Sequence, residues 1–290
     1  MMLTVGSLFS GVGGFDLGFE NEGYEISWQV ENDKFCNKLL EAKWPKVKRY
    51  GDIRNFLTLP AGEVAPVDVI TGGDPCPTRS LAKGNRKSNH PDLAGYFLAV
   101  VGRLRPQWVV RENVPAPDVK DFAAALESIG YRVVAFALDA RDFTSQSRRR
   151  QILVGCPGDR AAGFKRALLD AADGFGFSSS HAEETAAIAA CVTAHPARMA
   201  AEDSYVCEPE PCTDAILVQQ PPAGQETGNY LLQGDRLRVL TPEECEGLQG
   251  FPRGWTSGFS RSRRRQMLGN AIPVPFAEFA ARLIKQAEKV

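Results

Sequence analysis

Residues 3–14, with the sequence LTVGSLFSGVGG, decide the fold of this chain. The apolar run Leu3–Leu8 predicts a buried strand, which leads directly into the glycine-rich turn Phe9–Gly14 and a helical pattern over Phe15–Asn21. Glycines at such a junction let the backbone pass close to a ligand, and the helix N-terminus adds free N–H donors. A tight turn with no ligand explains the glycines about equally well, so the turn alone does not decide the function.

The same alternation of strands and helices continues to about residue 155. Apolar or β-branched runs predict further strands at Tyr24–Val30, Val67–Thr71, Trp108–Val110, Tyr131–Leu138 and Gln151–Val154. Helical spacing predicts a further helix at Phe122–Ile129. Such alternation builds a mostly parallel sheet with helices on both faces, which is an α/β fold. Because these sheets bind ligands at the carboxyl ends of their strands, polar motifs just after the strands are candidate site residues.

Two polar motifs follow predicted strands. In the motif Gly72–Pro77, Cys76 stands on a proline-bounded turn, where backbone dipoles and the nearby Arg79 and Lys83 would favour the thiolate. Glu112 lies in the same expected crevice, where the pKa of a carboxyl can be tuned for acid catalysis. The plain alternatives are an inert buried cysteine and an exposed glutamate.

The composition is that of a soluble globular protein. Of the 290 residues, 43% are hydrophobic and 24% are charged, which excludes a disordered chain and allows one large domain with an inserted lobe. No apolar run reaches the roughly 20 residues of a membrane span, and no signal peptide is expected. Seven irregularly spaced cysteines favour a reducing, cytoplasmic setting. Because the net charge is -1, any binding to nucleic acid must rely on local basic patches.

The alternation is lost between about residues 157 and 235, and regularity returns at the capped helix start Thr241–Glu244. We therefore expect a large domain over residues 1–160, completed by a C-terminal helix within 265–290, and a small lobe over 161–264.

The lobe has one metal alternative. Four of its residues would supply a zinc ligand set, namely Cys191, His195, Cys207 and Cys212. These spacings lack the tight Cys-x2-Cys pairing, so no metal is expected.

Six motifs, in this order along the chain, resemble those of the DNA cytosine-5 methyltransferases. They are the turn Phe9–Gly14, the dipeptide Pro75-Cys76, the triplet Glu112–Val114, the segment Gln146–Arg150, the segment Arg238–Pro252 and the motif Gly269–Pro273. The matches cover both ends of the chain. The resemblance implies a Rossmann-like S-adenosylmethionine-dependent methyltransferase sheet with a small inserted recognition lobe. It also implies S-adenosylmethionine as the donor and double-stranded DNA as the substrate.

The resemblance assigns four catalytic residues. Cys76 would add to carbon 6 of cytosine, which turns carbon 5 into a nucleophile for the methyl group. Glu112 would hold ring nitrogen 3 and the exocyclic amine. Arg150 would hold the ring carbonyl, and Arg148 would support the carboxylate or a phosphate. Because the reacting atoms cannot be reached inside a duplex, the base would be flipped out.

The resemblance also assigns binding residues. Those expected to hold the cofactor are Phe9, Ser10, Gly11, Gly13, Gly14, Glu31, Asn32, Asp52, Ile53 and Asn270. Among them, Glu31 would bind the ribose, and Asp52-Ile53 would lie against the adenine. Those expected to bind DNA, partly from a mobile loop over 80–92, are Arg79, Ser80, Lys83, Arg86, Lys87, Arg261 and Arg263. The protein is expected to act as a monomer.

This chain departs from the family pattern at three places. Asn32 replaces an aromatic residue, Pro77–Ser80 replaces Gln-x-Phe-Ser, and Arg111 replaces an apolar residue before the acidic triplet. We expect Arg79 and Arg111 to grip the DNA backbone. The alternatives are a structural ion pair with Asp74 or Asp118, or recognition of an anionic, carboxylated donor.

Two rival functions remain open at this point. One is methylation of cytosine in transfer RNA, because that branch of the family differs at the Pro-Cys turn and in the lobe. The other is a DNA-binding protein that has lost catalysis. Retention of Cys76, Glu112, Arg148 and Arg150 argues against this second rival.

Overall fold

The computed structural model describes residues 2–60, 62–75, 93–114, 118–144, 146, 148–174, 205–206, 215–218, 230–233 and 236–289. Several predicted residues lie outside the described ones. They are Cys76, the loop residues Arg79, Ser80, Lys83, Arg86 and Lys87, and the zinc candidates Cys191, His195, Cys207 and Cys212. Among the described residues, no group of His, Cys, Asp and Glu side chains is arranged to hold a metal ion.

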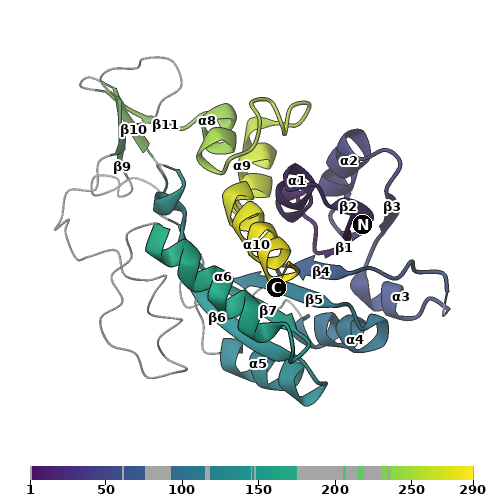
Figure 1. Cartoon of the computed structure of the whole chain (residues 1–290). Helices are drawn as coiled ribbons and strands as arrows, with labels where there is room; N and C mark the ends of the chain where they lie inside the picture. Colours follow the sequence, from purple (N-terminus) through teal and green to yellow (C-terminus); the bar gives the residue numbers. More distant parts are fainter. Residues whose placement is uncertain are drawn as a thin grey trace.

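Seven strands form the central sheet (Figure 1). They are β1 (Thr4–Leu8), β2 (Glu25–Val30), β3 (Lys48–Tyr50), β4 (Val69–Gly72), β5 (Trp108–Asn113), β6 (Arg132–Asp139) and β7 (Arg149–Cys156). The order is β3-β2-β1-β4-β5-β7-β6. Strand β7 runs antiparallel to β5 and β6, whereas the pairs among β1 to β5 are parallel. The predicted α/β fold with a mostly parallel sheet is therefore confirmed.

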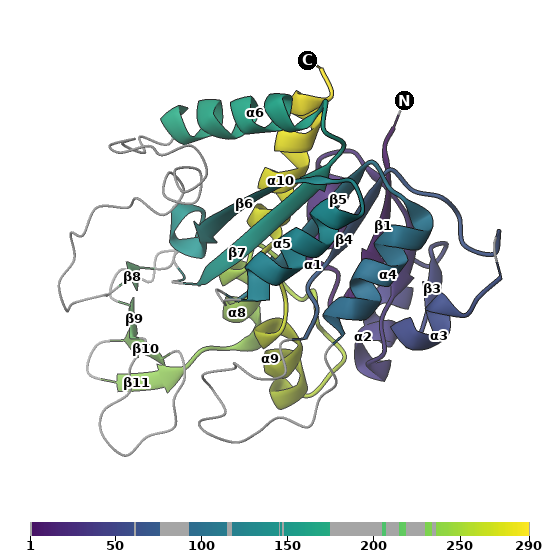
Figure 2. The ribbon, with the colours of Figure 1, turned by 90° about the horizontal axis from the view of Figure 1, so that it is seen from below.

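Helices cover both faces of this sheet (Figure 2). One hydrophobic cluster joins the sheet to α1 (Gly14–Asn21), α6 (Ala161–Gly174) and α10 (Val274–Ala287). A second cluster joins the other face to α3 (Ile53–Leu57), α4 (Ala94–Leu104) and α5 (Asp118–Ser128). Alternate side chains of a strand point to opposite faces. Accordingly, Trp108 and Val110 of β5 lie in the first cluster and Val109 lies in the second.

Strand β5 runs further than the sequence predicted. It continues from Val110 through Asn113 because Arg111, Glu112 and Asn113 all pair with β7, the last of them opposite Gln151. The predicted polar cluster at the end of this strand is confirmed, and its residues belong to the strand itself. Glu112 is held inside a hydrogen-bonded pair of strands, which fixes its position more firmly than a loop would.

The chain returns to the first helix through α8 (Pro242–Leu248), α9 (Arg261–Gly269) and α10. The Thr241 hydroxyl accepts the N–H of Glu244, and the Glu244 carboxylate accepts the N–H of Thr241. The predicted capped start of α8 is thus confirmed. A third cluster packs α9 against α1 and against α2 (Lys34–Lys43), through side chains such as Leu17, Leu40 and Met267.

A second, antiparallel sheet lies within the segment predicted to form the lobe. Its strands are β8 (Tyr205–Val206), β9 (Ala215–Val218), β10 (Tyr230–Gln233) and β11 (Arg236–Val239), in the order β11-β10-β9-β8. None of the described helices is long and apolar enough to cross a membrane.

Candidate active site

The glycine-rich turn lies where the strand order of the sheet reverses. The first strand, β1, stands between β2 and β4, and a crevice at such a reversal is a common ligand-binding position. The N–H of Gly11 donates to the Glu31 carboxylate at 2.7 Å, and the N–H of Asp33 donates to its other oxygen at 2.7 Å. Burial raises the pKa of Glu31, although these N–H donors act against the rise. The end of β2 thus brings a carboxylate to the turn.

The glycines of the turn differ in their surroundings. Gly11 has a positive φ of 55°, and a Cβ built on it would meet nothing closer than 3.9 Å. A Cβ on Gly13 would lie 2.5 Å from the Trp44 ring, and one on Gly14 would lie 2.5 Å from the carbonyl oxygen of Ile272. Packing therefore requires Gly13 and Gly14, whereas Gly11 leaves open space beside the turn.

The other predicted cofactor residues lie on separate loops. Asn32 is exposed beside the glycine turn, and Asn270 is exposed at the end of α9. Asp52 caps α3, where Arg54 donates to its carboxylate from the backbone N–H and from the guanidinium, at 2.5 Å for Nη2. This bonding to Arg54 lowers the pKa of Asp52 to about 2. Ile53 is buried in the core under α3.

Glu112 and Arg150 form an ion pair across β5 and β7. The Nε atom of Arg150 lies 2.9 Å from Oε1 of Glu112, and the two side chains are only 16% and 12% exposed. Burial raises the pKa of Glu112, although the charges of Arg150 and Arg148 act against the rise. A raised pKa favours the protonated carboxyl, which can donate a hydrogen bond to a ring nitrogen.

Arg148 connects this pair to the end of the chain. Its Nη2 donates to the carbonyl oxygens of Gly269 and Ala271, at 3.1 and 2.8 Å. Its backbone N–H donates to the Asp139 carboxylate at 2.9 Å. Burial, together with the charge of Arg150, lowers the pKa of Arg148 to about 10. Two motifs that are far apart in the sequence therefore meet beside the Glu112 strand.

Arg111 is an internal residue. It is 2% exposed, and its guanidinium binds the Asp74 carboxylate through Nε–Oδ1 at 2.5 Å and Nη2–Oδ2 at 2.8 Å. The carbon Cζ of Arg111 lies 4.1 Å from the centre of the Phe122 ring. The favoured prediction that Arg111 grips the DNA backbone is therefore wrong, because the side chain is buried and paired. The alternative, an ion pair with Asp74, is confirmed.

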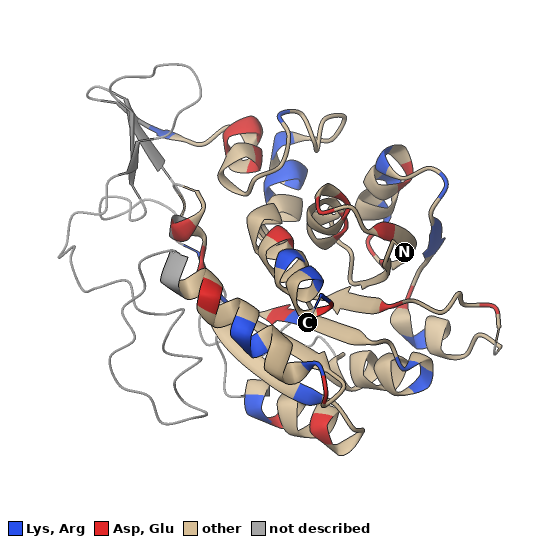
Figure 3. Ribbon diagram, viewed as in Figure 1, with Lys and Arg blue, Asp and Glu red and all other residues tan. Residues whose placement is uncertain are grey.

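Basic residues gather on α9 (Figure 3), and their side chains have different partners. Arg264 is buried and binds the carboxylates of Glu243, at 2.5 Å, and Glu246, at 2.8 Å. Arg263 lies over the Phe35 ring, with Cζ 4.1 Å from its centre, and 4.0 Å from the Asp33 carboxylate. Arg264 is thus held in the interior, and Arg263 is held beside the start of α2.

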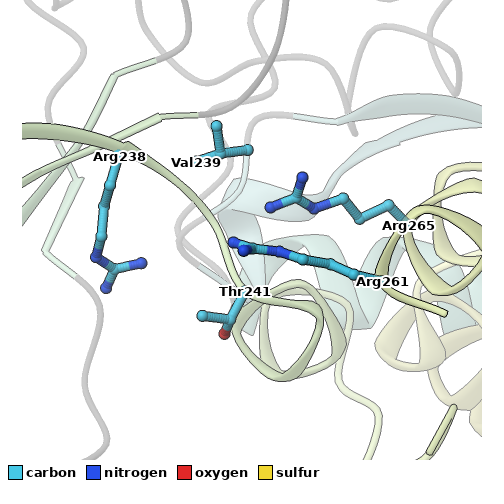
Figure 4. A pocket seen from close by; sticks show the side chains of 5 residues that line it. All are labelled: Arg238, Val239, Thr241, Arg261 and Arg265. Atoms are coloured by element: carbon cyan, nitrogen blue, oxygen red, sulfur yellow. The ribbon is translucent and has the colours of Figure 1, made fainter. Parts of the chain in front are cut away.

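An open hollow lies between β11 and α9 (Figure 4). It is lined by Arg238, Val239, Thr241, Arg261 and Arg265. Arg238 binds Glu244, with Nη2 2.6 Å from Oε1, and Arg265 donates to the carbonyl oxygen of Leu240. Arg261 is exposed on this hollow. The hollow has the basic character that suits a phosphate.

Comparison with known proteins identifies the family. The sequence profile of the C-5 cytosine-specific DNA methylases matches residues 3–167 and 169–286, which is nearly the whole chain. The chain belongs to the C-5 cytosine-specific DNA methylase family. The family methylates carbon 5 of cytosine in DNA and uses S-adenosylmethionine as the donor, so the predicted family, activity and cofactor are confirmed.

Relatives of this methylase include two bacterial type II methyltransferases. M.Bsp6I from Bacillus sp. is 35% identical over 167 residues, which cover 53% of this chain and 52% of that protein. M.HindV from Haemophilus influenzae is 29% identical over 303 residues, which cover 97% of this chain and 96% of that protein. The chain thus spans about half the length of the first relative and nearly all of the second.

A solved structure has the same fold. It is the crystal structure of an Escherichia coli prophage-encoded protein described as a DNA modification methyltransferase. It is 16% identical to this chain, with a TM-score of 0.61 over 99% of this chain and 100% of that one. The predicted methyltransferase sheet is therefore confirmed at the level of fold.

Reasoning from the sequence missed two site contacts of this methylase. Gly73 is one, because a Cβ there would lie 2.9 Å from Oε2 of Glu112. Asn113 is the other, because its amide lies 3.3 Å from the carbonyl oxygen of Asp74. Both residues are uncharged, so no pairing of opposite charges in the sequence points to them.

Proposed function

We propose that this methylase acts on cytosine in double-stranded DNA, with Cys76 as the nucleophile and Glu112 as the acid. One contact carries the proposal. The Glu112 carboxyl lies against Gly73, because a Cβ built on that glycine would be 2.9 Å from Oε2 of Glu112. Gly73 stands three residues before Cys76 in the sequence, so the acid is adjacent to the turn that leads into the nucleophile.

The residues divide the reaction between them. The Cys76 thiolate forms a bond to carbon 6 of a flipped cytosine, and the electron pair of the 5,6 double bond moves into the ring. Protonated Glu112 donates to ring nitrogen 3 and accepts from the exocyclic amine, which offsets the charge that develops there. Arg150 holds Glu112 and faces the ring carbonyl, and Arg148 supports both. Bound S-adenosylmethionine would supply the methyl group to carbon 5, and its sulfur would keep the electron pair of the broken bond as a neutral thioether. Loss of the carbon 5 proton to water and departure of the Cys76 thiolate then release the methylated base.

The residues at the end of β1 fit S-adenosylmethionine, which supplies the methyl group when it is bound. Gly11 leaves open space, and each oxygen of Glu31 keeps a further lone pair for a ribose hydroxyl. The ring of Phe9, whose centre lies 6.4 Å from that of Phe97, forms an apolar wall. The proposed contacts are Phe9, Ser10, Gly11, Gly13, Gly14, Glu31, Asn32, Asp52, Ile53 and Asn270, with Gly13 and Gly14 acting through packing.

Contacts to DNA complete the proposal. Those we assign are Arg79, Ser80, Lys83, Arg86 and Lys87 after the nucleophile, and Arg261 and Arg263 on α9.

We place the protein in the cytoplasm as a monomer. Because α6 packs on the sheet and α8–α9 precede α10 in the large domain, we propose a recognition lobe narrower than residues 161–264, between α6 and α8.

The central test is the nucleophile. Cys76→Ser should abolish methylation while leaving the affinity for S-adenosylmethionine unchanged, because the proposed cofactor contacts lie on other loops. A duplex containing 5-fluorocytosine should trap the unmodified protein as a covalent adduct, because fluorine cannot leave carbon 5 as a proton does. Cys245→Ser, at a cysteine in α8, is the matched control and should react normally. Methylation by Cys76→Ser at the normal rate would falsify the assignment.

A methylation assay on two substrates separates the rival functions. Labelled donor is incubated with duplex DNA or with transfer RNA, and the products are identified by nucleoside mass spectrometry. Methylated deoxycytidine is expected. Methylated cytidine from transfer RNA alone would support the RNA rival, and no product from either substrate would support a DNA-binding protein without catalysis.

A further inference from the structure

The turn before Cys76 is held by three consecutive residues of β5. Arg111 binds the Asp74 carboxylate through two hydrogen bonds, at 2.5 and 2.8 Å. The Glu112 carboxyl lies against Gly73. The Asn113 amide lies 3.3 Å from the Asp74 carbonyl oxygen and 3.4 Å from its Oδ2. The strand that carries the proposed acid is thus tied to the turn that leads into the proposed nucleophile.

We propose that the Arg111–Asp74 ion pair is a positioning device that fixes Cys76 relative to Glu112. The proposal rests on the proposed function of these two catalytic residues. Neither Arg111 nor Asp74 needs to touch the substrate, since they are 2% and 6% exposed. The ion pair acts instead through Pro75, which directly precedes Cys76 in the sequence. The proline ring restricts the backbone of Asp74, so an Asp74 held in place also limits the positions open to the next residues.

Directional geometry explains why an ion pair is present at this position. Buried ion pairs are often no more stabilising than apolar side chains of similar volume, so stability alone does not require one here. The planar guanidinium of Arg111 adds what an apolar pair lacks, because its two parallel bonds fix both the distance and the orientation of Asp74. The Phe122 ring, 4.1 Å from Cζ, supports the guanidinium from the α5 side.

The test uses a double substitution, because removing one partner alone would leave an unpaired buried charge and strongly destabilise the fold. Asp74→Leu combined with Arg111→Met replaces the ion pair by apolar side chains. We expect a folded protein with normal affinity for S-adenosylmethionine and for duplex DNA. Its covalent adduct with 5-fluorocytosine DNA should form about 10²-fold more slowly, the effect of a misplacement on the order of 1 Å. The turnover number should fall by the same factor while KM stays within about threefold.

Two further variants keep the test decisive. Arg160→Met combined with Glu288→Gln removes another ion pair, at 3.3 Å. This pair lies beside Trp108 at the amino-terminal end of β5, opposite the end that carries Glu112, and its loss should leave adduct formation unchanged. Arg111→Lys keeps the charge but not the two parallel bonds, so it should slow adduct formation by about tenfold. It takes the place of the double variant if that variant fails to fold.

The outcomes distinguish this proposal from the proposed function. Adduct formation at the normal rate by a folded double variant, or by Arg111→Lys, means that the pair serves stability alone and overturns the inference. Absence of any adduct with the unmodified protein overturns the proposed function, and the positioning role with it. A slow double variant beside an unchanged Arg160 control supports both.

Discussion

Glu112 is the residue whose surroundings govern the pH dependence of the site. Burial raises its pKa, so the protonated form persists to higher pH than for an exposed glutamate. If the protonated form is the working acid, turnover falls as the pH rises through this raised pKa. Glu112→Gln cannot titrate, so we expect that decline to disappear and turnover to drop about 10²–10⁴-fold. Measuring the turnover number against pH for both proteins tests the prediction.

A matched control exists for this substitution. Glu25 is exposed at the first residue of β2, at the opposite end of the parallel strands, and Glu25→Gln should change neither the turnover nor its pH profile. A Glu112→Gln protein that loses less than about threefold in turnover, with its high-pH decline intact, would mean that Glu112 only holds Arg150 in place.

At the level of single residues, the sequence predicted the chemistry better than the contacts. Spacing and resemblance singled out Glu112, Arg148 and Arg150, and the fold brings these three to one region. The partner of Arg111 was less predictable. An arginine beside a catalytic motif suits a phosphate and a carboxylate equally well, and only the register of β4 and β5, with Gly72 opposite Arg111, brings Asp74 within reach.

At the level of elements, strands with strong apolar patterns were predicted and polar ones were not. The short strand β3 consists of Lys48, Arg49 and Tyr50 at the edge of the sheet, so it has no apolar run to reveal it. The reversed direction of β7 was also missed, because alternation of strands and helices carries no information on strand direction. The helix α6 begins at Ala161, where the sequence predicts the start of the lobe.

Helix α9 carries the next prediction, which concerns the hollow it forms with β11. Arg261 is exposed there, so Arg261→Ala should weaken duplex binding without changing the affinity for S-adenosylmethionine. Loss of one phosphate contact should also make the slope of log affinity against log salt shallower by about 0.9. Fluorescence anisotropy over a salt series measures both quantities.

The control for α9 is an arginine of another element. Arg166 lies on α6, is 77% exposed and pairs with Asp170 of the same helix, so Arg166→Ala should leave both the affinity and the slope unchanged. Equal slopes for Arg261→Ala and the unmodified protein would remove Arg261 from the DNA interface, even if the affinity fell.

Over the whole molecule, the site depends on the packing of the segment from Gly269 to α10 against Arg148 and α1. Ala271 and Gly269 hold Arg148, and α10 begins three residues later and packs on α1. The sequence predicted this return of the chain only through the resemblance of the Gly269–Pro273 motif. Local pattern cannot supply it, because the contacts join residues more than 100 positions apart.

The crossing of α1 and α10 gives the last prediction. A Cβ on Gly18 would lie 2.5 Å from Cβ of Ala277 and 2.9 Å from the Val274 carbonyl oxygen, so Gly18→Ala must push α10 outward. We expect a loss of about 1–3 kcal/mol in the free energy of unfolding, measured by urea denaturation. In contrast, Gly102→Ala within α4 meets nothing within 4 Å and should stabilise the protein by about 0.5–1 kcal/mol. Because α10 follows the carbonyls that hold Arg148, Gly18→Ala should also lower turnover in the folded protein, whereas Gly102→Ala should not. Equal stability of the two variants would mean that the α1–α10 contact can relax without moving the site.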